Sequence, residues 1–208
     1  MVFGLLVSFS LPGLARDFGS TGLITMPTAD LLPQSYLNLN YSRIWGSESE
    51  DKITFAYGLK DDIQLGGRLA WYQQSRDLEA YPGFKINLWP EEGDYRPMVS
   101  VGASGWDQNL YVAASRYLHD YDFRVHLGVG DQGIFEDYIG LGLSKVLNPV
   151  LISTDNRSLD LPRIKVKAEY NSSMNLGLEF KFGPGIELEL GVVDLNDFTF
   201  GLGFENKF

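Results

Sequence analysis

The last eleven residues of the chain alternate between apolar and polar side chains with a period of two. The apolar parity holds Phe198, Phe200, Leu202, Phe204 and Phe208, and the polar parity holds Thr199, Gly201, Gly203 and Glu205. Strict alternation predicts a β-strand with one apolar face and one polar face. Such a strand fits either the closing strand of a membrane β-barrel or the last strand of a soluble β-sandwich, so the rest of the chain has to decide.

The same alternation recurs along most of the sequence. It predicts strands at 36–44, 52–57, 63–71, 83–89, 98–105, 110–118, 123–130, 138–145, 163–170, 175–182 and 186–192, with 198–208 as the last. The phase of 110–118 is ambiguous, and a further short element at 150–153 would change the count of about twelve. Short Gly-, Asn- and Asp-rich turns join the strands, and no helical period stands out.

Three features favour a membrane barrel over a sandwich. The polar parity carries Lys and Glu within strands, while the other parity is nearly pure Leu, Ile, Val and Phe. Aromatic residues gather near strand ends, as interfacial girdles require. In hydrocarbon every backbone group must pair, so a chain of strands must close on itself. We therefore expect residues 35–208 to form an all-β, antiparallel, up-and-down transmembrane β-barrel in which 198–208 pairs with 36–44. The even strand number predicts that both termini are periplasmic.

The N-terminus reads as an export signal. An apolar core at 2–9 is broken by Pro12 and followed by small residues at Gly13 and Ala15, although the usual basic start is missing. Residues 1–15 are thus a predicted signal peptide, with a buried first helix or strand as the alternative. Residues 16–34 are expected to form an N-terminal periplasmic segment.

One stretch carries a family resemblance. The segment Phe18-Gly19-Ser20-Thr21-Gly22-Leu23-Ile24, followed by Met26-Pro27-Thr28-Ala29-Asp30, resembles the opening of the YjbH-type outer-membrane proteins linked to bacterial exopolysaccharide. Later pieces are similar in style, so the resemblance spans nearly the whole mature chain. Known relatives are often much longer and some are lipoproteins, whereas this chain has no cysteine and reads as a short, single-barrel member.

The resemblance implies a bacterial outer-membrane protein with a role in exopolysaccharide production or export. It implies contact with outer-membrane lipids and lipopolysaccharide, with polysaccharide and with periplasmic export proteins. It also implies that the barrel-assembly machinery reads the terminal aromatic residues Phe204 and Phe208. Two other functions stay open: a general porin or small-solute channel, and a structural barrel that anchors a cell-envelope complex.

Catalytic, metal and cofactor chemistry are not expected. The chain has two histidines, and a lipase-like arrangement of His126 with Ser115 or Ser144 has no supporting motif. We predict that the protein is not an enzyme and holds no cofactor or metal. The formal charge of -10 argues against a nucleic-acid partner.

The polar parity predicts the residues that face the lumen. The residues expected to line it, and to contact a saccharide if one passes, are Arg68, Tyr72, Lys85, Arg124, His126, Tyr138, Lys165, Lys167, Glu169, Glu187 and Glu189. Trp89, Tyr111 and Tyr117 are expected to face inward as well or to line the mouths. The favoured interpretation is that these charges pair across strands and fill a narrow interior. The alternative is a polar channel whose aromatic faces suit a sliding sugar chain.

Overall fold

The computed structural model describes residues 21–46, 49–72, 78–93, 95–148 and 161–208. Within these ranges the chain forms twelve strands and two short 3-10 turns. The strands are β1 (Tyr36–Trp45), β2 (Glu50–Lys60), β3 (Ile63–Tyr72), β4 (Leu78–Trp89), β5 (Met98–Ser104), β6 (Asn109–Leu118), β7 (Phe123–Gly130), β8 (Ile139–Val146), β9 (Arg163–Asn171), β10 (Ser173–Lys181), β11 (Ile186–Val193) and β12 (Asp197–Lys207). The turns are η2 (His119–Tyr121) and η3 (Gly183–Gly185).

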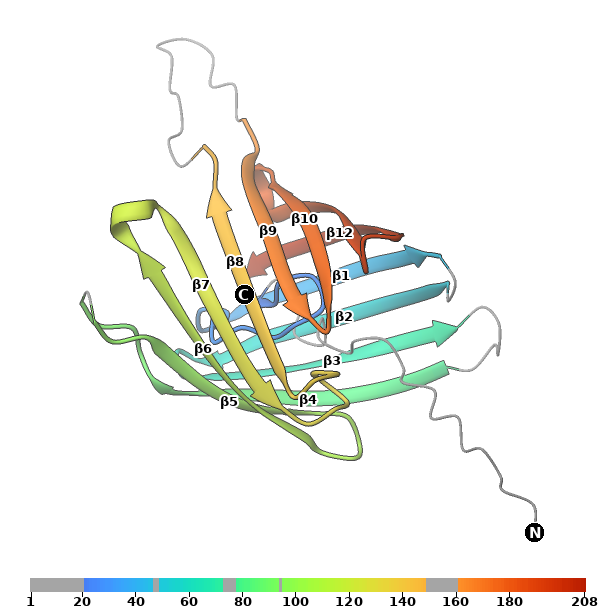
Figure 1. Ribbon diagram of the computed structural model, residues 1–208, viewed down its shortest axis with the longest axis horizontal. Coiled ribbons are helices and arrows are strands. Elements are labelled where there is room, and N and C mark those ends of the chain that lie inside the picture. Colours follow the sequence, from blue (N-terminus) through green and yellow to red (C-terminus); the bar gives the residue numbers. More distant parts are fainter. Residues whose placement is uncertain (1–20, 47–48, 73–77, 94, 149–160) are drawn as a thin grey trace.

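The strands form one closed barrel in which every strand pairs with its sequence neighbours (Figure 1). All pairings are antiparallel, and β12 closes the ring by pairing with β1 from Tyr36↔Lys207 to Trp45↔Phe198. The predicted barrel, its strand number and its closing pair are therefore confirmed. The amide of Phe208 donates to the carbonyl of Ser35 at 2.8 Å, so the barrel begins and ends at one rim. We call this rim the terminal end.

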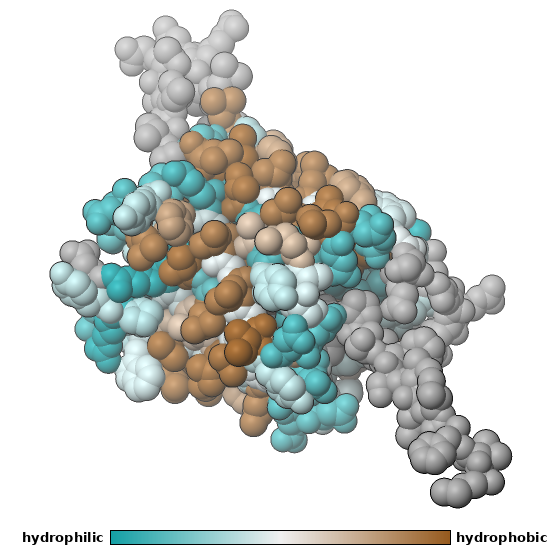
Figure 2. Space-filling view, in the orientation of Figure 1, coloured by the Kyte–Doolittle hydropathy of each residue, from teal (hydrophilic) through white to brown (hydrophobic). Residues whose placement is uncertain are grey.

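Alternation sorts the side chains into two faces. On β1 the polar side chains of Asn38, Asn40 and Ser42 are at most 5% exposed and point inward, whereas Leu39 is 50% exposed and points outward. Hydrophobic side chains gather in the middle of the outer surface, and polar ones lie toward its left and right edges (Figure 2). Trp45, Phe198 and Phe200 contact one another at the end opposite the terminal end, as in an interfacial girdle.

The alternation of inward and outward side chains breaks at two positions, and at each of them an aromatic side chain was expected to face the lumen. A bulge between Asn87 and Trp89 sets Trp89 opposite the outward-facing Val99, so Trp89 is 49% exposed and not in the lumen. Tyr138 adopts a left-handed backbone with a φ of 62° in the turn before β8. Its side chain is 53% exposed, so Tyr138 is not buried among the other predicted lumen residues. The phase of β6 is now defined, because Tyr111 is buried at 2% while Val112 is exposed at 47%.

The predicted signal peptide at 1–15 and the extra element at 150–153 lie outside the described residues. No helix within the described ranges is long and apolar enough to cross a membrane, a finding that concerns helices alone.

If the outer face contacts lipid, an arginine there will be costly at mid-strand and cheap near a rim. Leu202 lies at the middle of β12 and is 50% exposed, and Leu59 lies near the end of β2 and is 43% exposed. We expect Leu202→Arg to lower the free energy of unfolding by about 2–4 kcal/mol, and the control Leu59→Arg by about 0–1 kcal/mol. Denaturant unfolding in phospholipid vesicles measures both. Equal costs at the two positions would show that this face does not lie in hydrocarbon.

Candidate functional site

The segment before β1 folds into the barrel and fills part of the lumen. Residues 21–29 and Leu32 are buried, and Met26 and Ala29 have no exposed surface. Figure 1 shows this segment, in blue, inside the ring of strands. The sequence prediction placed residues 16–34 outside the barrel, and for 21–32 this is corrected. We call residues 21–32 the plug.

The plug is a tight turn whose backbone amides surround a carboxylate. The amide of Leu23 donates to the carbonyl of Met26 at 3.0 Å, and Gly22 forms an antiparallel bridge with Pro27. The next three amides, from Ile24, Thr25 and Met26, donate to the carboxylate of Glu169 at 2.8, 2.5 and 3.3 Å. Successive backbone amides of this kind form an anion-binding nest, and hydrogen bonds to a charged acceptor are the stronger ones. Glu169 on β9 therefore anchors one side of the plug.

Two further groups complete the Glu169 anchor. The hydroxyl of Thr25 donates to Glu169 at 2.5 Å. The side-chain amide of Asn175, on β10, donates to Glu169 at 2.9 Å and to the hydroxyl of Thr25 at 3.1 Å. Glu169 and Asn175 are 2% and 1% exposed, so water does not compete for these contacts.

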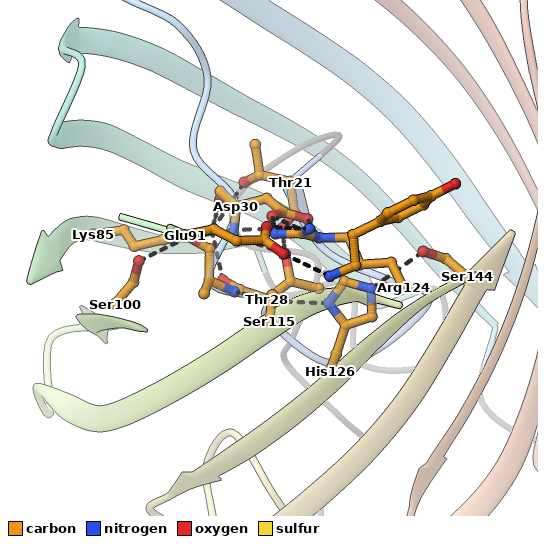
Figure 3. A network of polar contacts seen from close by, with 12 residues as sticks. Thr21, Thr28, Asp30, Lys85, Glu91, Ser100, Ser115, Arg124, His126 and Ser144 are labelled. Atoms are coloured by element: carbon orange, nitrogen blue, oxygen red, sulfur yellow. Dashed lines mark hydrogen bonds and ion pairs between the residues drawn. The ribbon is translucent and has the colours of Figure 1, made fainter. Parts of the chain in front are cut away.

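A lysine anchors the opposite side of the plug. Lys85 on β4 is fully buried, and its ammonium donates to the carbonyls of Asp30 and Thr28 at 2.7 and 3.0 Å (Figure 3). It also contacts the hydroxyl and the carbonyl of Thr21 at 3.1 and 3.4 Å. An ammonium group is a donor only, and the plug backbone supplies the carbonyl acceptors it requires.

The middle of the plug rests on a chain of hydroxyl and imidazole groups. Ala29 donates its amide to Ser115 at 3.0 Å, and its carbonyl accepts from Ser100 at 2.7 Å. His126 lies between Ser115 (2.8 Å) and Ser144 (3.2 Å), one serine at each ring nitrogen. A hydrolytic triad needs a carboxylate on the imidazole nitrogen that faces away from the nucleophile, and here a second serine takes that place. The arrangement supports the plug and lacks the acid of a triad.

An ion-paired arginine ties the plug to the loop between β4 and β5. Arg124 on β7 pairs with Asp30 at 2.7 Å and with Glu91 at 2.6 Å (Figure 3). Burial raises the pKa of Asp30, but the positive charges of Arg124, His126 and Lys85 together lower it by a larger amount, so the pKa lies below its usual value of 3.8. The plug therefore keeps this negative charge throughout the neutral range.

Apolar contacts hold the centre of the plug. Leu23, Met26 and Ala29 pack with Tyr111 and Ala113 of β6, and with Ile134 and Phe135 of the loop between β7 and β8. Inward-facing glycines make room for them. A Cβ atom on Gly142 would lie 2.0 Å from Leu23, and one on Gly58 would lie 2.0 Å from the carbonyl oxygen of Pro33 where the plug chain leaves the lumen.

Ion pairs fill the rest of the lumen. Lys167 contacts Glu179 at 2.7 Å and Glu189 at 3.4 Å across β9, β10 and β11. Lys181 contacts Glu187 at 3.0 Å, and Arg68 approaches Glu50 at 3.9 Å. The favoured interpretation from sequence, that the charges pair across strands, describes these residues.

Most of the residues predicted to line the lumen do so. Those less than 5% exposed are Arg68, Lys85, His126, Lys167, Glu169, Glu187 and Glu189. Tyr72, Arg124 and Lys165 are partly exposed, and Tyr138 is exposed in the turn before β8. Sequence reasoning did not single out Gln64, Ser100 or Asn175 as plug contacts, although their inward parity was visible.

The described residues contain no group of three or more His, Cys, Asp or Glu side chains that could hold a metal ion.

Comparisons with known proteins agree with the geometry. The family model described as "Exopolysaccharide biosynthesis protein YbjH" matches residues 15–141, which include the whole plug. The Escherichia coli (strain K12) "Uncharacterized lipoprotein YjbH" is 28% identical over 165 residues, covering 67% of this chain and 21% of that protein. The chain thus spans about a fifth of that relative's length. A solved KdgM porin, 14% identical, superposes with a TM-score of 0.52 over 82% of this chain and 99% of its own, which shows a shared porin-like fold.

Loss of the Glu169 anchor should release the plug. Because the chain has no cysteine, Met26→Cys supplies a single thiol that is fully buried when the plug is seated. We expect Glu169→Gln to raise the rate of maleimide labelling at this thiol by about tenfold or more, since hydrogen bonds to a charged group are worth about 1.5–3 kcal/mol. The control is Glu187→Gln, which removes a lumen carboxylate that does not touch the plug. Equal labelling rates in the two variants would contradict the anchor.

Proposed function

Since this chain belongs to the family of the exopolysaccharide biosynthesis protein YbjH, we propose that it serves exopolysaccharide production or export at the bacterial outer membrane. In this proposal the barrel is closed while the plug is seated, and it conducts when the plug is displaced. The proposed saccharide role rests on the family description, and the proposed opening mechanism rests on the plug.

The observation that carries the mechanism is the polar seat of the plug. Glu169 and Lys85 anchor the two sides of the plug. Four uncharged polar side chains also form hydrogen bonds with it: Gln64, Ser100, Ser115 and Asn175. Displacing the plug would leave these groups on the wall of a hydrophilic passage. Hydroxyl, amide and charged groups of this kind can bind water or the hydroxyls of a sugar chain in its place.

The outer membrane is the location proposed for three reasons. The barrel is closed, its outer face is apolar, and its fold is that of a porin. We further propose that the terminal end faces the periplasm, since bacterial barrels with an even strand number keep both termini there. This location implies three kinds of partner. They are lipopolysaccharide, the barrel-assembly machinery acting on Phe204 and Phe208, and periplasmic export proteins. No catalytic step is required.

The filled lumen also supports a second candidate, a structural barrel that anchors a cell-envelope complex. In that case the plug would be a permanent part of the core. The two candidates differ in what happens when the plug anchors are removed.

Removing both anchors should open the barrel. We expect wild-type protein in planar bilayers to be closed for most of the time, and the double variant Glu169→Gln, Lys85→Met to show open steps about tenfold or more often. Glu187→Gln again serves as the control. A double variant that is folded and as sealed as wild type would favour the structural barrel.

The saccharide role is tested separately in cells. We expect removal of the protein from its host to lower the carbohydrate precipitated from culture medium, and a plasmid copy to restore it. Unchanged carbohydrate output would reject the exopolysaccharide role while leaving the plug mechanism standing.

A further inference from the structure

A second site lies at the terminal end, outside the plug. A cavity of about 350 Å³ is lined by Tyr95, Arg116, Tyr117, His119, Asp120 and Tyr121. Most of its wall comes from the end of β6 and from η2, and Tyr95 reaches it from the loop between β4 and β5. Its volume falls within the range of about 300–1,000 Å³ found for small-ligand sites.

The cavity combines aromatic rings at the terminal rim, and one of them, Tyr121, also contacts Phe123 with ring centroids 5.8 Å apart. Tyr95 is 90% exposed and Tyr121 is 67% exposed. Tyr117 meets His119 edge to face, with ring centroids 4.9 Å apart. The faces of such rings carry partial negative charge and attract weakly positive C–H groups. Sugar rings present C–H groups of this kind on one side and hydroxyls at their edges.

Polar groups of both signs lie beside these rings. The Nε atom of Arg116 is buried and has no hydrogen-bond partner among the described residues, so it is a donor without an acceptor. The exposed carboxylate of Asp120 supplies acceptors in the same cavity. The lining is thus close to neutral, with donors and acceptors next to aromatic faces.

We propose that this cavity binds a neutral oligosaccharide, one sugar ring lying against Tyr95 or Tyr121 and its hydroxyls contacting Arg116 and Asp120. The proposal rests on the saccharide role proposed above and places a sugar contact at the terminal rim. A phosphate group fits less well, because Asp120 lines the same cavity and repels an anion. A hydroxyl both donates and accepts, and so matches an Arg and Asp pair.

Calorimetric titration of the purified full-length barrel, reconstituted in nanodiscs, tests the site. The probes are maltohexaose and cellohexaose, with inorganic phosphate as the anionic comparison. We expect wild type to bind at least one hexaose, and Tyr95→Ala and Tyr121→Ala each to weaken binding by about three- to tenfold. Arg116→Gln should weaken binding by a similar factor, because its neutral amide no longer supplies a charged donor.

The matched control is Tyr138→Ala, which removes an exposed tyrosine from the opposite end of the barrel and should leave binding unchanged. Absence of binding to both hexaoses would overturn the proposal, as would equal binding by the Tyr95, Tyr121 and Tyr138 variants. Displacement by phosphate would overturn it in favour of an anion or lipid-headgroup site. Failure of this proposal can be told apart from failure of the proposed function, because carbohydrate output and plug release are measured in other assays.

Discussion

A twelve-stranded barrel encloses more space than its own side chains fill, and this constraint governs the rest of the molecule. About eight strands leave an interior that side chains fill, whereas about 16–18 leave an aqueous channel. This barrel lies between those sizes and is filled from three sources. These are ion pairs such as Lys167 with Glu179, the loop that carries Phe135, and the plug. Without the plug, the groups that now hold it would face open space.

The chemistry of the plug contacts bears on the proposed displacement of this segment. A permanent core would be apolar throughout, because exchange with water then costs the whole hydrophobic term. Here the apolar centre around Met26 is small, and both anchors are hydrogen bonds to ionised groups. Such groups exchange protein partners for water with a net change of only about 1.5–3 kcal/mol each. The family motif therefore encodes a turn whose amides fit a carboxylate, and its Gly22 and Pro27 shape that turn.

Much of the barrel could be predicted from sequence, because strand alternation reports directly which side chains face lipid. The twelve strands and seven buried lumen residues followed from parity, and the β1–β12 closure followed from the need of every backbone group to pair in hydrocarbon. Parity failed where the backbone leaves the regular strand, at the bulge before Trp89 and at the left-handed turn of Tyr138. The plug was missed for a different reason. Its contacts join distant residues, such as Leu32 and Gln64, 32 positions apart, and Ile24 and Glu169, 145 positions apart, and no local pattern reports such a pairing. The sequence did offer one signal, a row of inward-facing glycines such as Gly142. A strand position without a side chain leaves space in the lumen, and here the plug residue Leu23 occupies it.

The plug and the terminal cavity share one loop, and this gives the two sites a physical connection. Glu91, in the loop that carries Tyr95, accepts the amide of Tyr117 at 2.7 Å and pairs with Arg124. Arg124 in turn holds Asp30 of the plug. A ligand shifts an equilibrium only by its difference in affinity for the two states. A sugar that binds Tyr95 equally well with the plug seated or displaced would therefore leave the plug where it is. A sugar that binds more tightly once the loop has moved away from Arg124 would break the Glu91–Arg124 pair, and it would shift the plug by its difference in affinity for the two plug states. The loop from β4 to β5 is thus the element that joins a saccharide at the rim to the lumen.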